Sequence, residues 1–129
     1  MSERRDLARL ARSFFGFYAD GDVEAARSLM AEDAVSYVTN ADAGTDRLVG
    51  RDAFVDRLPD LTGADLRVGI VQVVVVDDQR VLTMIEIRAQ RDDATLHNFA
   101  AFLARVPGDL ITELRMVDAK PAVSDEFWA

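Results

Sequence analysis

Two side chains in the C-terminal third of the sequence, His97 and Asp118, could carry out acid–base chemistry together. His97 is the single histidine of the chain, and an imidazole titrates near neutral pH, so it could take a proton from a carbon acid or from water. A carboxylate beside the ring would orient it and stabilise its charged form. If Pro107-Gly108 is the centre of the last hairpin, His97 lies opposite Asp118 on one face of a sheet. The sequence therefore predicts a general-base pair, with a half-solvated cross-strand polar pair as the alternative.

The composition of the chain limits the other kinds of site. The 129 residues include no cysteine, which excludes disulfides, thiolate nucleophiles and cysteine metal sites. A single histidine cannot build a multi-histidine metal site, and we expect neither a metal nor a cofactor. The 15 basic and 23 acidic side chains give a formal charge of −8, which repels phosphate backbones and anionic lipid surfaces. We therefore expect no nucleic-acid partner and no membrane partner.

The elements that must position these side chains follow from the periodicity of the apolar residues. Helical spacing predicts helices at 3–19, 22–31 and from Gly50 to Pro59. Extended and β-branched runs predict strands at 34–40, 47–49, 71–76, 81–90, 95–106 and 110–119. The nearly continuous valines of 71–76 predict a strand that is covered on both faces. The short turns between the later strands favour antiparallel hairpins.

This order predicts one α+β domain over residues 1–129. Three N-terminal helices are expected to pack in the concave face of a strongly curved, mainly antiparallel sheet. No apolar run approaches the ~18 residues that a membrane-spanning helix needs, and the N-terminus has no apolar signal core. We expect a cytoplasmic protein whose C-terminal segment 124–128 is ordered.

Four segments carry a family resemblance. The first, 18–35, ends one helix at Gly21, caps the next at Asp22 and starts a strand. The others are 50–54, 106–115 and 118–121. In this order and spacing the segments resemble the SnoaL-like family of the nuclear transport factor 2-like (cystatin-like) superfamily. The resemblance implies a cone-shaped α+β fold with a ligand pocket.

The resemblance also implies which catalytic groups to look for. Ketosteroid isomerases of this superfamily use a helical tyrosine, an aspartate base and a second acid. The matching positions here hold Phe14, Val38 and His97. Limonene-type epoxide hydrolases use an Arg-x-Asp strand and a further aspartate. The matching positions hold Ile85, Ile87 and Met116. SnoaL-type polyketide cyclases use an acidic base in an apolar cavity, for which Asp118, with His97, is the equivalent.

We expect an apolar cavity between the first helix and the sheet, with His97 and Asp118 at its polar end. The expected lining is Phe14, Tyr18, Val38, Asn40, Ile85, Ile87, Phe99 and Met116. Asn40 would orient a ligand carbonyl or, alternatively, is an ordinary turn residue. Such a cavity suits an apolar or aromatic small molecule with one polar group.

Three functions remain open. The chain is a small-molecule-binding protein, a lyase, isomerase or cyclase that uses His97 and Asp118 for proton transfer, or a non-catalytic interaction module. A homodimer through the outer face of the sheet is expected in each case, because Phe102 and the valines 73–75 would add to a large exposed apolar patch. Glu113 and Arg115 are available for polar pairing across that interface.

Overall fold

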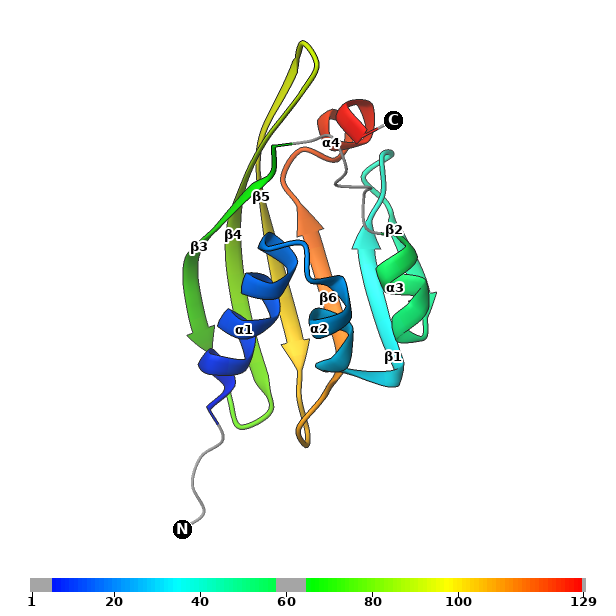
Figure 1. Ribbon diagram of the computed structural model, residues 1–129. Helices are drawn as coiled ribbons and strands as arrows, with labels where there is room; N and C mark the ends of the chain where they lie inside the picture. Colours follow the sequence, from blue (N-terminus) through cyan, green and yellow to red (C-terminus); the bar gives the residue numbers. More distant parts are fainter. Residues whose placement is uncertain (1–5, 58–64, 129) are drawn as a thin grey trace.

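The computed structural model describes residues 6–57 and 65–128 and has the expected α+β architecture (Figure 1). The helices are α1 (Leu7–Ala19), α2 (Val23–Ser28), α3 (Arg51–Arg57) and α4 (Pro121–Trp128). The strands are β1 (Met30–Thr39), β2 (Thr45–Val49), β3 (Arg67–Val75), β4 (Arg80–Arg91), β5 (Ala94–Arg105) and β6 (Ile111–Asp118). The six strands form one sheet in the order β2-β1-β6-β5-β4-β3.

The sheet is antiparallel except at one place. Strand β1 pairs with β6 in parallel, which brings the beginning and the end of the chain together in the middle of the sheet. The sheet is curled, and α1, α2 and α3 all lie on the same face of it (Figure 1). The predicted fold is therefore confirmed. Among the described residues, no helix has the length and apolar character needed to cross a membrane.

Local sequence signals account for the junction between α1 and α2. Gly21 has a φ of 77°, the left-handed region that a side chain with a Cβ rarely adopts, and it ends the first helix. The carboxylate of Asp22 accepts a hydrogen bond from the backbone N–H of Ala25 at 3.1 Å and so caps the second helix. Both details agree with the sequence-based prediction.

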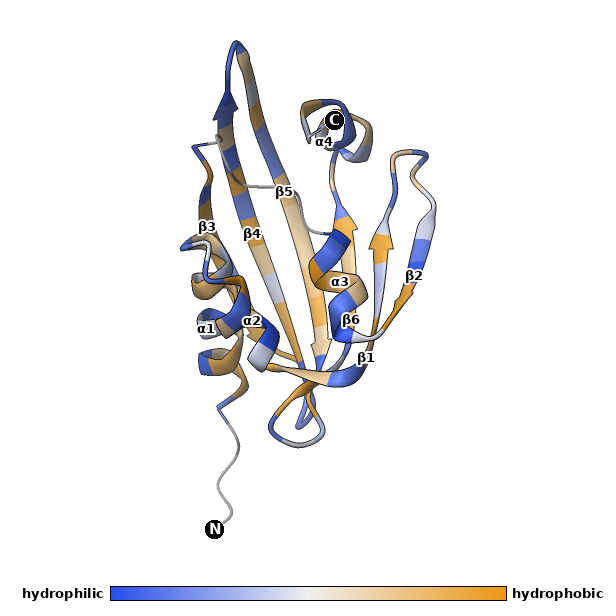
Figure 2. Ribbon diagram, turned by 45° about the vertical axis from the view of Figure 1, so that its right-hand side comes forward, coloured by the Kyte–Doolittle hydropathy of each residue, from blue (hydrophilic) through white to orange (hydrophobic). Residues whose placement is uncertain are grey.

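A line of aromatic rings joins α1 to the sheet and to α3. The ring centroids of Phe14 and Phe15 are 5.1 Å apart, and Phe15 lies 4.8 Å from Phe102 of β5. Phe14 lies 6.4 Å from Phe54 of α3. Figure 2 shows apolar segments along α1 and along the strands that it covers. Burial of a large apolar side chain contributes ~1.5–3 kcal/mol, so these rings hold the helical layer against the sheet.

Strand β3 differs from the expectation of a strand covered on both faces. It lies at the edge of the sheet, and Val71, Val74 and Val75 are exposed. Helix α1 contacts β3 on the inner side only, where Val68 and Ile70 pack against the core. A continuous apolar run does not by itself distinguish a central strand from an edge strand, and the prediction for 71–76 is wrong on this point.

The register of the β5–β6 hairpin also differs from the prediction. Ala100, rather than His97, is the partner of Asp118. The chain between the two strands is tied to the rest of the protein instead of forming a tight turn, because the N–H of Val106 donates to Gln79 and that of Ile111 donates to Leu29. The register is therefore displaced by an odd number of residues, which turns every β5 side chain to the opposite face.

Helix α4 includes the C-terminal segment that was expected to be ordered. The helix begins at Pro121, so Ser124 lies inside it. Phe127 is buried against Ala89 and Leu96 in a second, smaller apolar cluster. The helix lies beyond the end of β6, at the end of the sheet away from the start of α1 (Figure 1).

Candidate functional site

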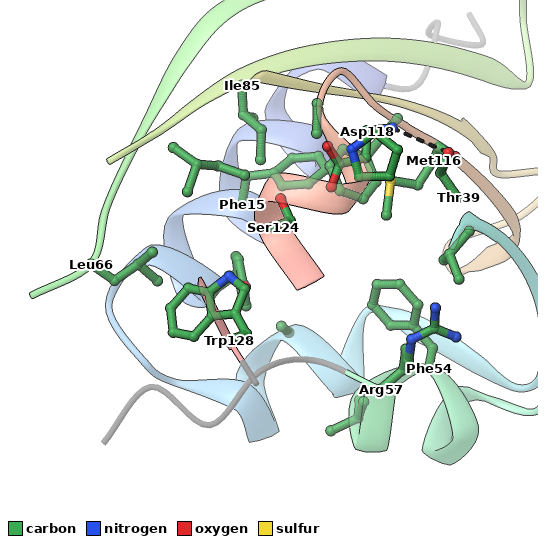
Figure 3. Close-up of a pocket in the computed structure, with 18 of the residues that line it drawn as sticks. Phe15, Thr39, Phe54, Arg57, Leu66, Ile85, Met116, Asp118, Ser124 and Trp128 are labelled. Carbon is green, nitrogen blue, oxygen red and sulfur yellow. Dashed lines mark hydrogen bonds between the residues drawn. The ribbon is translucent and has the colours of Figure 1, made fainter. Parts of the chain in front are cut away.

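A cavity of about 350 Å³ lies between the helices and the concave face of the sheet (Figure 3). All four helices and strands β1, β4, β5 and β6 contribute to its wall. The apolar lining consists of Phe14, Phe15, Val23, Ala26, Met30, Val38, Ala41, Phe54, Val55, Leu66, Ile85, Ile87, Leu96, Ala100, Phe102, Met116, Pro121 and Trp128. The indole of Trp128 and the side chain of Leu66 lie beside each other at one end, where α4 adjoins the cavity (Figure 3).

The cavity contains most of the residues that the sequence placed there. Eight of the predicted positions are in its wall, namely Phe14, Tyr18, Val38, Asn40, Ile85, Ile87, Met116 and Asp118. The other two, His97 and Phe99, lie on the outer face of the sheet and do not reach it. The displaced β5 register explains both exceptions.

His97 forms a polar cluster on the outer face instead. Its Nε2 lies 2.6 Å from Oε2 of Glu86, which also accepts a hydrogen bond from Arg88 at 3.0 Å. The hydrogen bond with His97, followed by the charge of Arg88, holds the pKa of Glu86 below its usual range. His97 and Asp118 therefore point to opposite faces of the sheet, and the prediction of a general-base pair formed by these two residues is wrong.

Asp118 places a carboxylate in the cavity wall at the end of β6, and Asp125 of α4 is the other acidic residue of the described wall. Its Oδ1 accepts hydrogen bonds from Nδ2 of Asn98 at 2.6 Å and from the backbone N–H of Lys120 at 2.7 Å. Its own backbone N–H donates to Oγ1 of Thr39 at 3.2 Å, the contact that is dashed in Figure 3. This set of bonds connects β5, β6 and β1 and fixes the position of the carboxylate.

Tyr18 supplies a hydroxyl to the cavity from the last turn of α1. Burial raises the pKa of Tyr18 to about 12 because the charged phenolate would lose its hydration. The hydroxyl is therefore neutral at physiological pH and can donate a hydrogen bond to a ligand. The unfolded chain loses this proton near pH 10, so this group lowers the stability of the folded state as the pH rises from about 10 towards 12, and not below.

We expect the raised pKa of Tyr18 to be measurable in a Tyr37→Phe variant, because Tyr18 is then the single tyrosine of the chain. The phenylalanine keeps the ring under Arg115, whose guanidinium carbon lies 4.2 Å from the ring centroid. In a spectrophotometric titration, the tyrosinate absorbance should rise with a midpoint well above 10, near 12. Circular dichroism at each pH controls for unfolding. A midpoint near 10 in the folded protein would contradict the burial of this hydroxyl.

Asn40 reaches the cavity wall but uses its amide to build the β1–β2 turn. Its Oδ1 accepts from the N–H groups of Asp42 and Gly44 at 3.1 and 2.9 Å. Its Nδ2 donates to Asp46 at 3.0 Å, and this bond, together with Arg57, holds the pKa of Asp46 below its usual range. The amide is committed to the turn, which supports the turn-residue alternative for Asn40.

Several residues of the cavity were missed from the sequence. Ala100 and Phe102 line the cavity from β5, and Asn98 lies buried on the same inner face beside Asp118, although the predicted register placed this face outward. A signal was present: this face of β5 also carries Leu96 and Ala104 and is apolar apart from Asn98. The contributions of α3 and α4, including Phe54 and Trp128, depend on tertiary packing and have no local signature. In the part of the chain that the structure describes, no group of three His, Asp or Glu side chains is placed to hold a metal ion.

Comparison with known proteins places this geometry in a family. An uncharacterised protein of Mycobacterium tuberculosis is 30% identical over 132 residues, which cover 100% of both chains. A protein from a soil-derived mobile gene cassette has a similar structure, with a TM-score of 0.77, 22% identity and 95% of each chain covered. An LEH-like epoxide hydrolase of M. tuberculosis matches with a TM-score of 0.70 and 18% identity, covering 91% of this chain and 85% of that one.

At these identities the two solved structures show a shared fold and no shared activity. The family model described as the SnoaL-like domain matches residues 11–114, which include α1 from Ala11 onward, strands β1 to β5, the first half of β6 and most of the cavity wall. The chain belongs to the SnoaL-like family.

Proposed function

We propose that the protein binds a hydrophobic or aromatic small molecule with one polar group in the cavity between the helices and the sheet. The observation that carries this proposal is the cavity itself, about 350 Å³ with a mostly apolar wall. This volume is within the ~300–1,000 Å³ of small-molecule sites, in which burial of apolar area supplies affinity and a few polar groups supply orientation. Tyr18 and Asp118 are the polar groups on which this proposal rests, and the wall also includes the polar residues Arg27, Thr39, Asn40, Arg57, Ser124 and Asp125.

Tyr18 and Asp118 differ in whether they donate or accept a hydrogen bond. The neutral Tyr18 hydroxyl donates a hydrogen bond, and the Asp118 carboxylate accepts one. A ligand that places an oxygen against Tyr18 or a hydroxyl against Asp118 would gain orientation as well as affinity. The relative named as an LEH-like epoxide hydrolase is one example of this fold used for a small molecule.

Binding can be tested with 2-methoxynaphthalene, a fluorescent aromatic probe. We expect saturable binding of one molecule per chain, followed by probe fluorescence, and displacement of the probe by hydrophobic molecules extracted from the host cell. The protein heated above its melting temperature is the control. Absence of saturable binding by the folded protein, together with no copurified small molecule in native mass spectrometry, would contradict the proposal.

Proton transfer by Asp118 alone is a second candidate function, favoured by the position of its carboxylate in an apolar wall. With a carbon-acid substrate, Asp118→Asn should lower turnover by ~10²–10⁴ and leave substrate affinity within a few fold, because the amide keeps the shape and cannot act as a base. Steady-state kinetics separates the two effects. Full turnover in Asp118→Asn would remove this candidate.

We also propose that the outer face of the sheet pairs with a second copy of the chain. Met84, Phe99, Ala101 and Val117 adjoin one another across β4, β5 and β6, and we call them the outer patch. Met84, Phe99 and Val117 are 37%, 38% and 63% exposed. Phe102 and Val73, which were expected to enlarge such a patch, pack against the core instead.

Charged pairs lie on both sides of the outer patch. Arg88 binds Glu86 at 3.0 Å on β4, and Arg115 binds Glu113 at 2.9 Å on β6. Each pair contains both signs, so a two-fold axis through the patch can place an acidic group of one chain against a basic group of the other. This self-complementarity favours a second copy over another partner.

A further inference from the structure

The two oxygens of the Asp118 carboxylate have different surroundings. Oδ1 accepts two hydrogen bonds, from Nδ2 of Asn98 at 2.6 Å and from the N–H of Lys120 at 2.7 Å. For Oδ2, none of the described residues provides a hydrogen bond. An ionised carboxylate has about four acceptor positions, so the unused capacity is concentrated on Oδ2. Because Asp118 lies in the cavity wall, this oxygen is available to a bound molecule.

The side chain of Asn98, which bonds to Oδ1 and not to Oδ2 of Asp118, is itself held in one orientation. Its side chain is 0% exposed, and Nδ2 donates both to Asp118 and to Oγ of Ser124 at 2.7 Å. The amide oxygen accepts from the N–H of Phe99 at 2.8 Å. Turning the amide over would place its oxygen against the Asp118 carboxylate, where two acceptors would repel each other. The observed orientation is therefore the one that satisfies all three partners.

The neighbouring hydroxyl of Thr39 has no proton left to donate to a ligand. It accepts from the N–H of Asp118 and donates to the carbonyl of Met116, each at 3.2 Å. Its single proton is therefore in use within the sheet. The Asp118 carboxylate is therefore the acceptor in this hydrogen-bond network that is left for a ligand, although Ser124 and Asp125 of α4 also line the cavity.

We propose that Asn98 is a positioning residue that holds Oδ1 of Asp118 and leaves Oδ2 for the ligand, so that the cavity selects molecules whose polar group donates a hydrogen bond. The class comprises phenols, alcohols and N–H compounds on a hydrophobic frame. Acceptor-only analogues, such as ethers and esters, can accept from Tyr18 but leave Oδ2 of Asp118 without a donor. This inference rests on the proposed binding function and adds the chemical class of the ligand.

The selectivity can be measured with two probes that share one ring system. At pH 7, 2-naphthol carries a hydroxyl donor, and 2-methoxynaphthalene carries only an acceptor at the same position. We expect the unmodified protein to bind 2-naphthol ~10-fold or more tightly, because a hydrogen bond to a charged group is being compared with none. Equal affinities, or a preference for the ether, would overturn the inference without any variant being made.

The variant Asn98→Leu separates positioning from a structural role. Leucine has a similar size and no donor, so the carboxylate loses its fixed orientation. The ratio of the two affinities should fall towards one, while the affinity for 2-methoxynaphthalene changes less than ~3-fold. A loss of affinity for both probes by the same factor would show that Asn98 acts only on the structure and would overturn the inference. Asn98→Met provides the same comparison if the leucine variant does not fold.

The matched control is His97→Leu, the neighbouring residue on the same strand whose side chain points to the outer face. His97→Leu should leave the ratio of the affinities for 2-naphthol and 2-methoxynaphthalene unchanged. A fall of this ratio towards one in the variant would contradict the assignment of Asn98 as the positioning residue. The outcomes also separate this inference from the proposed function. If the ether binds and the naphthol has no advantage, the inference alone fails, whereas if neither probe binds, both fail.

Discussion

Replacement of Ala100 by tryptophan should abolish binding of hydrophobic probes. Ala100 is 6% exposed, lies in the cavity wall between Ile85 and Asp118 and points inward. An indole at this position would occupy the space in which a ligand is expected to lie. We expect the Kd for 2-methoxynaphthalene to rise by ~100-fold or more, which corresponds to about 2.7 kcal/mol. Titration of the probe fluorescence provides the measurement.

The control for this variant is Thr95→Trp, because Thr95 is exposed on the same strand and lies outside the cavity. It should bind the probe as the unmodified protein does. Thermal unfolding of both variants shows whether the fold is kept, because overpacking a buried position typically costs about 1–3 kcal/mol. Probe binding that survives in a folded Ala100→Trp protein would place the ligand elsewhere.

Introduction of a charge at Val117 should convert the proposed dimer into a monomer. Val117 is 63% exposed at the outer patch, opposite Ala101 on β5. In Val117→Asp, two like charges would approach each other across the two-fold axis in an apolar contact, where an unpaired carboxylate is costly to bury. Sedimentation at micromolar concentration should give the mass of one chain for the variant and of two chains for the unmodified protein.

The matching control is Val123→Asp, which makes the same substitution at an exposed valine of α4, away from the outer patch. This variant should remain a dimer. A single-chain mass for the unmodified protein would show that the exposed outer face does not pair under these conditions. The proposed small-molecule cavity would be unaffected by that result, since its wall comes from one chain.

The elements of the fold could be predicted because their signals are local. Gly21 and Asp22 mark the α1–α2 junction through a positive φ and a capped N–H, and both requirements concern residues within a few positions. The family-like segments supplied the arrangement of these elements in space. The edge position of β3 was not predictable, because the exposure of Val71 and Val75 depends on which strands are its neighbours.

The candidate site was predicted on β6 and missed on β5. Met116 and Asp118 face the cavity as expected, whereas His97 faces away and the side chain that bonds to Asp118 from β5 is Asn98. The cause is the connection between the strands, which is held by hydrogen bonds from Val106 and Ile111 to distant carbonyl groups. The length of a loop that is fixed by tertiary contacts cannot be derived from its own residues, and strand register depends on that length.

The parallel pairing of β1 with β6 has a consequence for how the chain acquires its structure. Met30 and Val35 find their partners at Ile111 and Glu113, so the sheet cannot close until almost the whole chain has been synthesised. Contacts of such large sequence separation carry a high entropic cost before they become favourable, and they slow folding. A β1–β2 hairpin that formed before β6 was synthesised would have an edge without a neighbour, and unpaired strand edges favour aggregation. Recruitment of β1 by β6 is therefore the step at which this fold is most exposed to misassembly and at which a chaperone would have its largest effect on yield.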